Sequence, residues 1–363
     1  MAPVILAARS RGLDSEVCVT GQHREMLDQA LACFDVVPDT NLSIMQQDQT
    51  LSGVTVRALS VLEEFFRRKR FAIVVVQGDT TTTFCAALAA FYSGIPVAHI
   101  EAGLRTGDKL SPYPEEMNRL LTTRLTDMHF APTEWARDNL LQEAVPAKQI
   151  FVTGNTVIDA LHFAVKRARR SPPAMPGLTS PELDGRRLVL VTSHRREAFG
   201  RGIASICGAV AQLANEFPDV CFAYSVHMNP NVFGPVHRRL KGVRNVLLLP
   251  PVEYLQFVWL LDRCTLVLTD SGGVQEEAPS LGKPVLVMRE TTERPEGIRA
   301  GVARLVGTNQ DRIASEAANL LVNAQDYEEM ARATNPYGDG FASQRIVDVC
   351  EKVLAEELRL NCA

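Results

Sequence analysis

Residues 188–197 have the sequence Leu-Val-Leu-Val-Thr-Ser-His-Arg-Arg-Glu, an unbroken apolar run that ends in hydroxyl and charged side chains. A run without alternating polar residues is typical of a parallel strand that is buried on both faces. In the first half of the chain, residues 73–79, Ile-Val-Val-Val-Gln-Gly-Asp, have the same pattern. Each stretch therefore predicts a buried parallel strand with functional side chains at its carboxyl end.

The whole chain repeats this alternation of short apolar runs and longer helical patterns. Strands are predicted at residues 16–20, 72–77, 97–101, 128–131, 150–153, 188–193, 220–226, 246–250, 266–270, 285–288 and 302–306. Such repetition favours two Rossmann-like, doubly wound α/β domains, with the ligand in the cleft between them. We expect residues 1–165 to form the first domain and residues 188–342 the second. Residues 166–187 are basic and rich in proline, so they are expected to form a linker rather than continue a helix.

Length and composition limit the classes of protein to which this chain can belong. It has 363 residues, of which 46% are hydrophobic and 22% are charged, and its formal charge is −4. These values exclude disordered and low-complexity chains, and the small negative charge argues against a nucleic-acid binder. The longest apolar run, residues 84–92, has nine residues, whereas a membrane span needs about 20. We therefore expect neither nucleic acid nor a membrane as a partner.

The eight cysteines contain no C-x-x-C pair, which argues against a zinc site. The apolar surroundings of several of them predict reduced side chains in the core of a cytoplasmic protein. Arg9 and Arg11 interrupt the first apolar stretch, so a signal peptide is not expected.

Three carboxylates in the first half of the chain lie close to predicted strand ends. Asp79 precedes four threonines, Glu101 follows a buried run, and Glu115 follows a Pro-Tyr-Pro segment. Each has a structural explanation as well: Asp79 as a helix cap, Glu101 as the partner of Arg105, and Glu115 as an acid in the first turn of a helix. Three such carboxylates together favour proton transfer at the strand ends.

In the second half of the chain the patterns indicate an anion site. His194 is followed by two arginines at a strand end, although a single histidine is more often structural. Residues 269–277, Thr-Asp-Ser-Gly-Gly-Val-Gln-Glu-Glu, place two glycines between a strand and a helix. This arrangement favours a backbone nest for phosphate over a plain tight turn, and an acid in the helix that follows suits ribose hydroxyls. The residues predict a nucleoside diphosphate ligand without separating an epimerase from a glycosyltransferase.

Seven motifs, taken in order along the chain, resemble those of the non-hydrolysing UDP-N-acetylglucosamine 2-epimerases. They are QGDTTTT at residues 77–83, HIEAGLRT at 99–106, SPYPEEMNR at 111–119, VTGNTVIDA at 152–160, HRRE at 194–197, DSGGVQEE at 270–277 and NPYGDG at 335–340. The resemblance therefore covers essentially the whole chain.

The resemblance implies a glycosyltransferase-B-like fold in which a C-terminal helix, here residues 343–363, crosses back to the first domain. It implies interconversion of UDP-GlcNAc and UDP-ManNAc, which supplies ManNAc for bacterial surface polysaccharides. Family members work without NAD, metal or another cofactor, usually as homodimers. The implied route is anti elimination of UDP to give 2-acetamidoglucal. The C2 proton is then replaced on the other face, and UDP adds back.

By matching motifs, the resemblance implies that Asp79, Glu101, Glu115 and His194 carry the chemistry. The carboxylates would move the C2 proton, and His194 would protonate or stabilise the departing UDP. The implied substrate-binding residues are Val252, Phe257, Ser271, Gly272, Gly273, Glu277 and Arg294. Gln22 and His227 match part of an allosteric UDP-GlcNAc site, although Glu25 departs from the glutamine of allosteric members.

The chain departs from the family pattern at its start. In the family, a strand and a loop of G-T-R-P-E type, which helps bind the substrate phosphates, precede the segment that matches Met1. We expect the gene to encode that strand upstream, because losing a central strand leaves buried backbone groups unpaired at about 1–3 kcal/mol each. The chain as printed is then expected to be poorly stable and nearly inactive.

Two alternative functions stay open at this point. The first is a UDP-sugar glycosyltransferase of the same fold, which the three carboxylates argue against. The second is an inactive nucleotide-sugar binder, which the absent loop favours.

Overall fold

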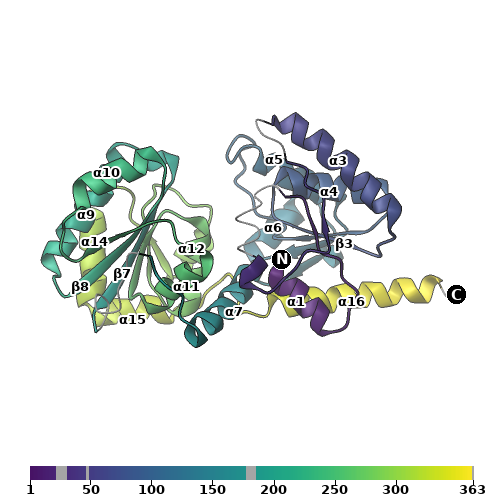
Figure 1. Cartoon of the computed structure of the whole chain (residues 1–363). Coiled ribbons are helices and arrows are strands. Elements are labelled where there is room, and N and C mark those ends of the chain that lie inside the picture. Colours follow the sequence, from purple (N-terminus) through teal and green to yellow (C-terminus); the bar gives the residue numbers. More distant parts are fainter. Residues whose placement is uncertain (22–30, 46–48, 177–184, 362–363) are drawn as a thin grey trace. The chain divides into compact units, whose positions relative to one another are not determined.

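The computed structural model describes residues 1–21, 31–45, 49–176 and 185–361, and the chain divides into two compact units. Unit 1 comprises Met1–Ala160 and Tyr337–Ala363, and unit 2 comprises Leu161–Pro336 (Figure 1). The last residues of the chain therefore belong to the same unit as the first.

Unit 1 is built around a parallel sheet of four strands in the order β3-β4-β5-β6. These strands are β3 (Val74–Gln77), β4 (Val97–Ile100), β5 (Met128–Ala131) and β6 (Ile150–Val152). A separate parallel pair consists of β1 (Cys18–Val19) and β2 (Thr40–Asn41). Side chains alternate along each strand, so the two faces of the four-stranded sheet contribute to different cores.

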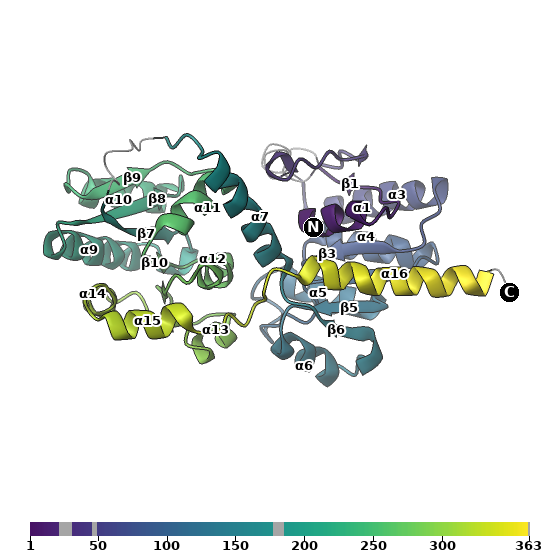
Figure 2. The ribbon, with the colours of Figure 1, turned by 90° about the horizontal axis from the view of Figure 1, so that it is seen from below.

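Helices cover both faces of this sheet. The described helices that lie wholly in unit 1 are α1 (Ala2–Ser10), α3 (Leu51–Arg68), α4 (Thr81–Tyr92), α5 (Glu115–Leu125), α6 (Glu134–Gln142) and α16 (Ala342–Asn361), with the 3-10 turn η1 (Ala147–Gln149). On one face α3 and α4 bury Val76 and Val97. On the other face α1 and α16, which lie side by side (Figure 2), bury Ala98 and Ile100.

Unit 2 contains one parallel sheet of six strands in the order β12-β11-β10-β7-β8-β9. The strands are β7 (Arg187–Ser193), β8 (Val220–Val226), β9 (Val246–Leu249), β10 (Leu266–Thr269), β11 (Val285–Val287) and β12 (Ala303–Leu305). Numbered along the unit, this order is 3-2-1-4-5-6, which is that of a Rossmann fold. The strand order therefore reverses between β7 and β10, where ligands of such folds bind.

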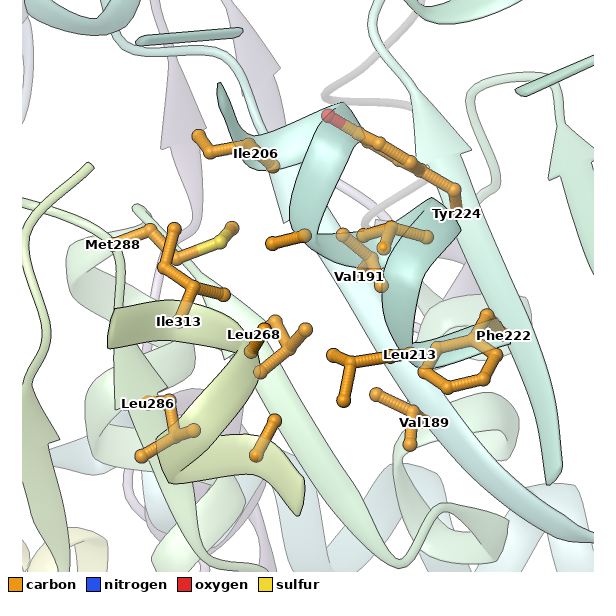
Figure 3. Packing of buried hydrophobic residues seen from close by; sticks show 14 of the residues in the cluster. Val189, Val191, Ile206, Leu213, Phe222, Tyr224, Leu268, Leu286, Met288 and Ile313 are labelled. Atoms are coloured by element: carbon orange, nitrogen blue, oxygen red, sulfur yellow. The ribbon is translucent and has the colours of Figure 1, made fainter. Parts of the chain in front are cut away.

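A continuous apolar core fills unit 2 on the side of the sheet that α9 and α14 cover. The described helices that lie wholly in unit 2 are α9 (Arg201–Glu216), α10 (Pro230–Leu240), α11 (Tyr254–Arg263), α12 (Gly272–Glu277), α13 (Pro295–Arg299), α14 (Gln310–Val322) and α15 (Ala324–Arg332), with the 3-10 turns η2 (Arg196–Ala198) and η3 (Ala278–Leu281). Val189, Phe222 and Leu268 from the strands meet Leu213 of α9 and Ile313 of α14 (Figure 3). In the described ranges, no helix has the length and apolar character needed to cross a membrane.

The predicted strands all form, and their ends differ from the predicted ends by two residues at most, whereas β2 was not predicted. The expectation that residues 166–170 begin a linker is wrong, because they end the helix α7 (Thr156–Arg170). Leu161, Val165 and Ala168 are buried at helical spacing, and Arg169 pairs with Asp262. Arginine and alanine are good helix formers, so the helix stops only before the prolines that follow. The division between the two units falls within α7, after residue 160.

We predict that Asp159 anchors the start of α16. Its carboxylate accepts hydrogen bonds from the backbone N–H groups of Ala342 at 3.1 Å and Ser343 at 2.8 Å, and from the Ser343 hydroxyl. Asp159→Ala should lower the free energy of unfolding by about 1–3 kcal/mol, because these donors lose a buried acceptor. Urea unfolding measures the loss. The control is Asp348→Asn, which removes an exposed partner of Arg11 from α16 and should change the free energy of unfolding by less than about 0.5 kcal/mol. Equal losses in the two variants would contradict the assignment.

Candidate active site

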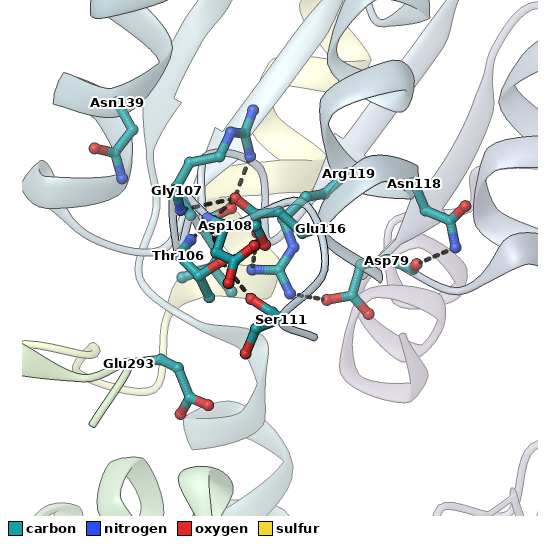
Figure 4. Close-up of polar contacts among 12 residues, drawn as sticks. Asp79, Thr106, Gly107, Asp108, Ser111, Glu116, Asn118, Arg119, Asn139 and Glu293 are labelled. Carbon is teal, nitrogen blue, oxygen red and sulfur yellow. Dashed lines mark hydrogen bonds and ion pairs between the residues drawn. The ribbon is translucent and has the colours of Figure 1, made fainter. Parts of the chain in front are cut away.

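The loop after β3 places Asp79 beside two residues of α5. Oδ2 of Asp79 lies 2.5 Å from Nη2 of Arg119, and the side-chain amide of Asn118 donates to the Asp79 carbonyl at 2.9 Å (Figure 4). Gly78 has a φ of +77°, which glycine adopts without strain. The explanation of Asp79 as a helix cap is wrong, because Thr80 occupies the cap position of α4. An ion pair, rather than a cap, therefore holds this carboxylate at the strand end.

The two adjacent acids at the start of α5 have different surroundings. Glu116 is buried, contacts Arg119 at 3.3 Å, and accepts hydrogen bonds from the N–H groups of Thr106 and Gly107, both at 3.1 Å. This carboxylate is therefore committed to holding the loop after β4. Glu115 is half-buried in the first turn of the helix, and its carboxylate makes no hydrogen bond or ion pair with another described residue. Of the pair, Glu115 is the acid whose carboxylate is available to a ligand.

Glu101 follows β4 in a strained backbone conformation. Its φ is +66°, in the left-handed region, which costs a residue other than glycine about 1–3 kcal/mol. Such conformations persist where the surroundings impose them, and they are frequent at functional sites. Nε2 of Gln77 donates to Oε1 of Glu101 at 3.1 Å. The alternative of a salt bridge to Arg105 is wrong, because Arg105 pairs with Glu143 at 2.6 Å instead.

A buried histidine on β4 fixes the loop that carries Asp79. Nε2 of His99 lies 2.7 Å from the carbonyl oxygen of Gly78, and since a carbonyl only accepts, Nε2 carries the proton. Burial lowers the pKa of His99 to about 4, and it lowers the pKa of His129, its neighbour on β5, to about 4 as well. Sequence reasoning assigns His99 no role, since a histidine inside an apolar run carries no sign of the group it bonds.

In unit 2, a cavity of about 210 Å³ lies at the carboxyl ends of β7 and β8 and beside α11 and α12. The lining residues are Thr192, Ser193, His194, Ser225, Val226, His227, Pro251, Val252, Phe257, Ser271 and Val274. The cavity thus brings together His194, His227, Val252, Phe257 and Ser271, which the sequence predicts as site residues but which are widely separated along the chain.

His194 is the first residue after β7, and two side chains contact its imidazole. The ring stacks on that of His227, with 5.9 Å between centroids and 23° between planes. Its Nδ1 atom lies 3.2 Å from Oδ1 of Asp270, which is the first residue after β10. Asp270 belongs to the predicted glycine motif but was assigned no role of its own, and its spatial contact with His194 is what identifies it.

The two glycines of the predicted phosphate nest begin α12. A Cβ atom on Gly272 would lie 3.2 Å from Cζ of Arg294, so a larger residue there would displace that guanidinium. Glu276 holds Arg294 in place through a bond of 2.8 Å between Nε and Oε1. A Cβ atom on Gly273 would meet no atom within 4 Å, so the space beside this residue is open.

Of two further predicted residues, Glu277 is described by the structure and Gln22 is not. Glu277 is buried at the end of α12, where burial raises the pKa of its carboxyl to about 7 and the Tyr254 hydroxyl donates to it at 3.0 Å. Gln22, one half of the expected allosteric pair, lies outside the described residues. Its partner, His227, lines the same cavity as His194.

Comparison with known proteins gives long matches. The family profile of UDP-N-acetylglucosamine 2-epimerase matches residues 6–351. The chain is 53% identical over 352 residues to the UDP-N-acetylglucosamine 2-epimerase of Escherichia coli (strain K12), covering 96% of this chain and 94% of that protein. It is similar to the crystal structure of UDP-GlcNAc 2-epimerase from Neisseria meningitidis bound to UDP-GlcNAc (TM-score 0.87, 46% identity, 97% and 96% of the two chains). It is also similar to the Methanocaldococcus jannaschii UDP-GlcNAc 2-epimerase in complex with UDP-GlcNAc and UDP (TM-score 0.78, 32% identity, 97% and 95%).

The two buried histidines of unit 1 predict a pH dependence of stability. An exposed histidine has a pKa of about 6.5, so between about pH 4 and 6.5 the unfolded chain binds more protons than the folded one. The free energy of unfolding should therefore fall as the pH is lowered through this window. His129→Gln removes one of the two rings and should reduce the slope by up to about 1.4 kcal/mol per pH unit. Urea unfolding between pH 4 and 7 measures the slope, and an unchanged slope in the variant would contradict the prediction.

Proposed function

Because this chain belongs to the UDP-N-acetylglucosamine 2-epimerase family, it is an isomerase of UDP-GlcNAc, and we propose that it acts by eliminating and re-adding UDP. UDP-GlcNAc and UDP-ManNAc are interconverted through 2-acetamidoglucal. The observation that carries the proposal is the arrangement of Asp79, Glu101 and Glu115. The first two follow β3 and β4 of one parallel sheet, and the third begins the helix whose Arg119 pairs with Asp79.

The chemistry of C2 explains why carboxylates are needed. The C2 proton of the sugar is not acidic, so it leaves only as the bond between C1 and the UDP oxygen breaks. The electrons of that bond leave with UDP, and those of the C2–H bond form the double bond of the glucal. In the second half of the reaction, C2 receives a proton on its other face and UDP adds to C1. Each face of C2 therefore needs a proton-transfer group, and the departing diphosphate needs stabilisation.

The carboxylates of unit 1 are held in ways that suit this chemistry. The ion pair with Arg119 fixes the position of Asp79, and the hydrogen bond from Gln77 orients Glu101. Holding such groups in place before the substrate arrives lowers the cost of reaching the transition state. The same three carboxylates argue against the glycosyltransferase alternative, because glycosyl transfer removes no proton from C2.

We propose that unit 2 binds the UDP part of the substrate. The cavity beside His194 presents apolar side chains, including Val252 and Phe257, to which a uracil ring can pack. The backbone N–H groups at the start of α12 and the open space beside Gly273 suit the diphosphate, to which Arg294 adds a cation. Glu277 accepts hydrogen bonds from the ribose hydroxyls in this proposal.

The wider role proposed here rests on the family likeness. The enzyme supplies ManNAc units for bacterial surface polysaccharides, works in the cytoplasm as a homodimer, and needs no cofactor. Light scattering on the purified protein tests the oligomeric state.

The mechanism predicts solvent exchange at C2. In heavy water, both the product and the recovered UDP-GlcNAc should carry deuterium at C2, because the glucal takes up its proton from a group that exchanges with solvent. Proton NMR of the reaction mixture, without added NAD or metal, measures the exchange. Epimerisation with full retention of the C2 proton would exclude the elimination route.

Two substitutions test the assigned catalytic residues. Glu101→Gln and His194→Ala should each lower kcat by at least about 10²-fold, because they remove a proton-transfer group and a group that stabilises the leaving UDP. Glu64→Gln, at an exposed pair with Arg68, and His237→Ala, at a ring stacked on Phe233, are the matched controls and should keep near-normal rates. Near-normal turnover by Glu101→Gln or His194→Ala would remove that residue from the catalytic set.

A further inference from the structure

We propose that Asp270 is a positioning residue for His194: it holds a proton on Nδ1 of the imidazole and so directs proton exchange with the leaving UDP to Nε2. The inference rests on the proposed function for its catalytic meaning. The contact itself rests only on the geometry of unit 2.

The sheet register explains why the two side chains meet. Thr269 of β10 is paired with Thr192 of β7, and their hydroxyl groups are hydrogen-bonded at 2.6 Å. The strands are parallel, so both chains leave the sheet at the same edge. The first residues beyond the two strands, Asp270 and His194, are therefore neighbours.

The Asp270 carboxylate is fully buried and is held by the loop that it orients. Oδ2 accepts hydrogen bonds from the backbone N–H groups of His194 at 2.8 Å and Arg195 at 2.9 Å. Oδ1 lies 3.2 Å from Nδ1 of His194, and this buried oxygen accepts no hydrogen bond from the described residues. A buried carboxylate oxygen without a donor is costly, and an N–H group on Nδ1 of His194 is the nearby donor that would satisfy it.

This arrangement selects one tautomer of His194. A neutral imidazole has one N–H group, and an ionised carboxylate can only accept, so the proton is favoured on Nδ1. The stacked ring of His227 keeps the plane of the imidazole, and the ring lines the cavity. Nε2, on the opposite edge of the ring from Asp270, is then the atom that exchanges protons.

The proton balance of the proposed reaction needs such an arrangement. When C1–O breaks, the bond electrons go to the UDP oxygen, and protonated Nε2 donates its proton to the diphosphate. When UDP adds back to C1, the same proton returns to Nε2. Nδ1 stays protonated against Asp270 throughout, so the carboxylate stabilises the charged ring without itself taking up a proton.

The test uses Asp270→Asn in the full chain. The asparagine oxygen can still accept from the two backbone N–H groups, whereas its amide can only donate toward Nδ1. Nitrogen-15 NMR of histidine-labelled protein, recorded above the pH range in which imidazole titrates, reports which ring nitrogen carries the proton. The His194 signal is assigned by its loss in His194→Ala. We expect the proton on Nδ1 in the wild type and on Nε2 in Asp270→Asn.

Turnover provides the second measurement. Asp270→Asn should lower kcat for UDP-GlcNAc by about 10²-fold or more, as is typical when a histidine is held in the wrong tautomer, with a smaller change in KM. Asp262→Asn, which removes an equivalent charge from the pair with Arg169 in the same unit, is the control and should keep both the His194 tautomer and kcat.

The tautomer of His194, the loss of kcat and the activity of the wild type each decide a different point. A wild-type His194 with its proton on Nε2, or a tautomer that Asp270→Asn does not change, would overturn the proposal even if the variant folded poorly. Equal losses of kcat in Asp270→Asn and Asp262→Asn would also overturn it, because Asp270 would then act only through stability. If the wild type does not epimerise UDP-GlcNAc at all, the proposed function fails, while the ring spectrum still decides whether Asp270 controls His194.

Discussion

The parallel pairing of β7 with β10 is the contact on which the rest of unit 2 depends. It joins the two halves of the six-stranded sheet at the position where the strand order reverses. Helices leave these two strands toward opposite faces of such a sheet, so the edge beyond their carboxyl ends is not covered by a connection. His194, Asp270 and Ser271 all lie at this edge, one to two residues after their strands. The apolar core beneath holds the two strands in register, and its close packing fixes the positions of the site residues.

In unit 1, buried polar contacts hold the carboxylates at the strand ends in position. Its acids sit on loops after β3 and β4, where an apolar core alone would not orient a carboxylate. Arg119 reaches from α5 to Asp79, and His99 donates from β4 to the carbonyl before Asp79. Glu101 is held in a left-handed conformation that the surrounding structure must impose. Each of these contacts joins segments that are more than 15 residues apart, so each forms only when the sheet is complete.

Much of the architecture could be predicted because buried parallel strands are short, apolar and bounded by polar loops. The predictions failed where local composition competed with burial. Residues 166–170 have the composition of a basic linker, but the helix continues to Arg170 because Leu161, Val165 and Ala168 are buried on one of its faces. Aspartate is common at the first position of a helix, yet Thr80 caps α4 and Asp79 is paired with Arg119 instead. The two residues of β2, Thr40 and Asn41, are both polar, so no apolar run marks this strand.

The amino-acid sequence was sufficient to predict the alternation of strands and helices, the family motifs and the residue types at each strand end, because these follow from the local hydrophobic pattern and from the order of residues along the chain. Five of the eleven residues that line the cavity of unit 2 were also predicted from it. The partner of each charged group depends instead on the folded chain: Arg119 for Asp79, Glu143 for Arg105, and Asp270 for His194. The physical reason is that charges pair according to distance in space, and sheet register and helix packing set those distances.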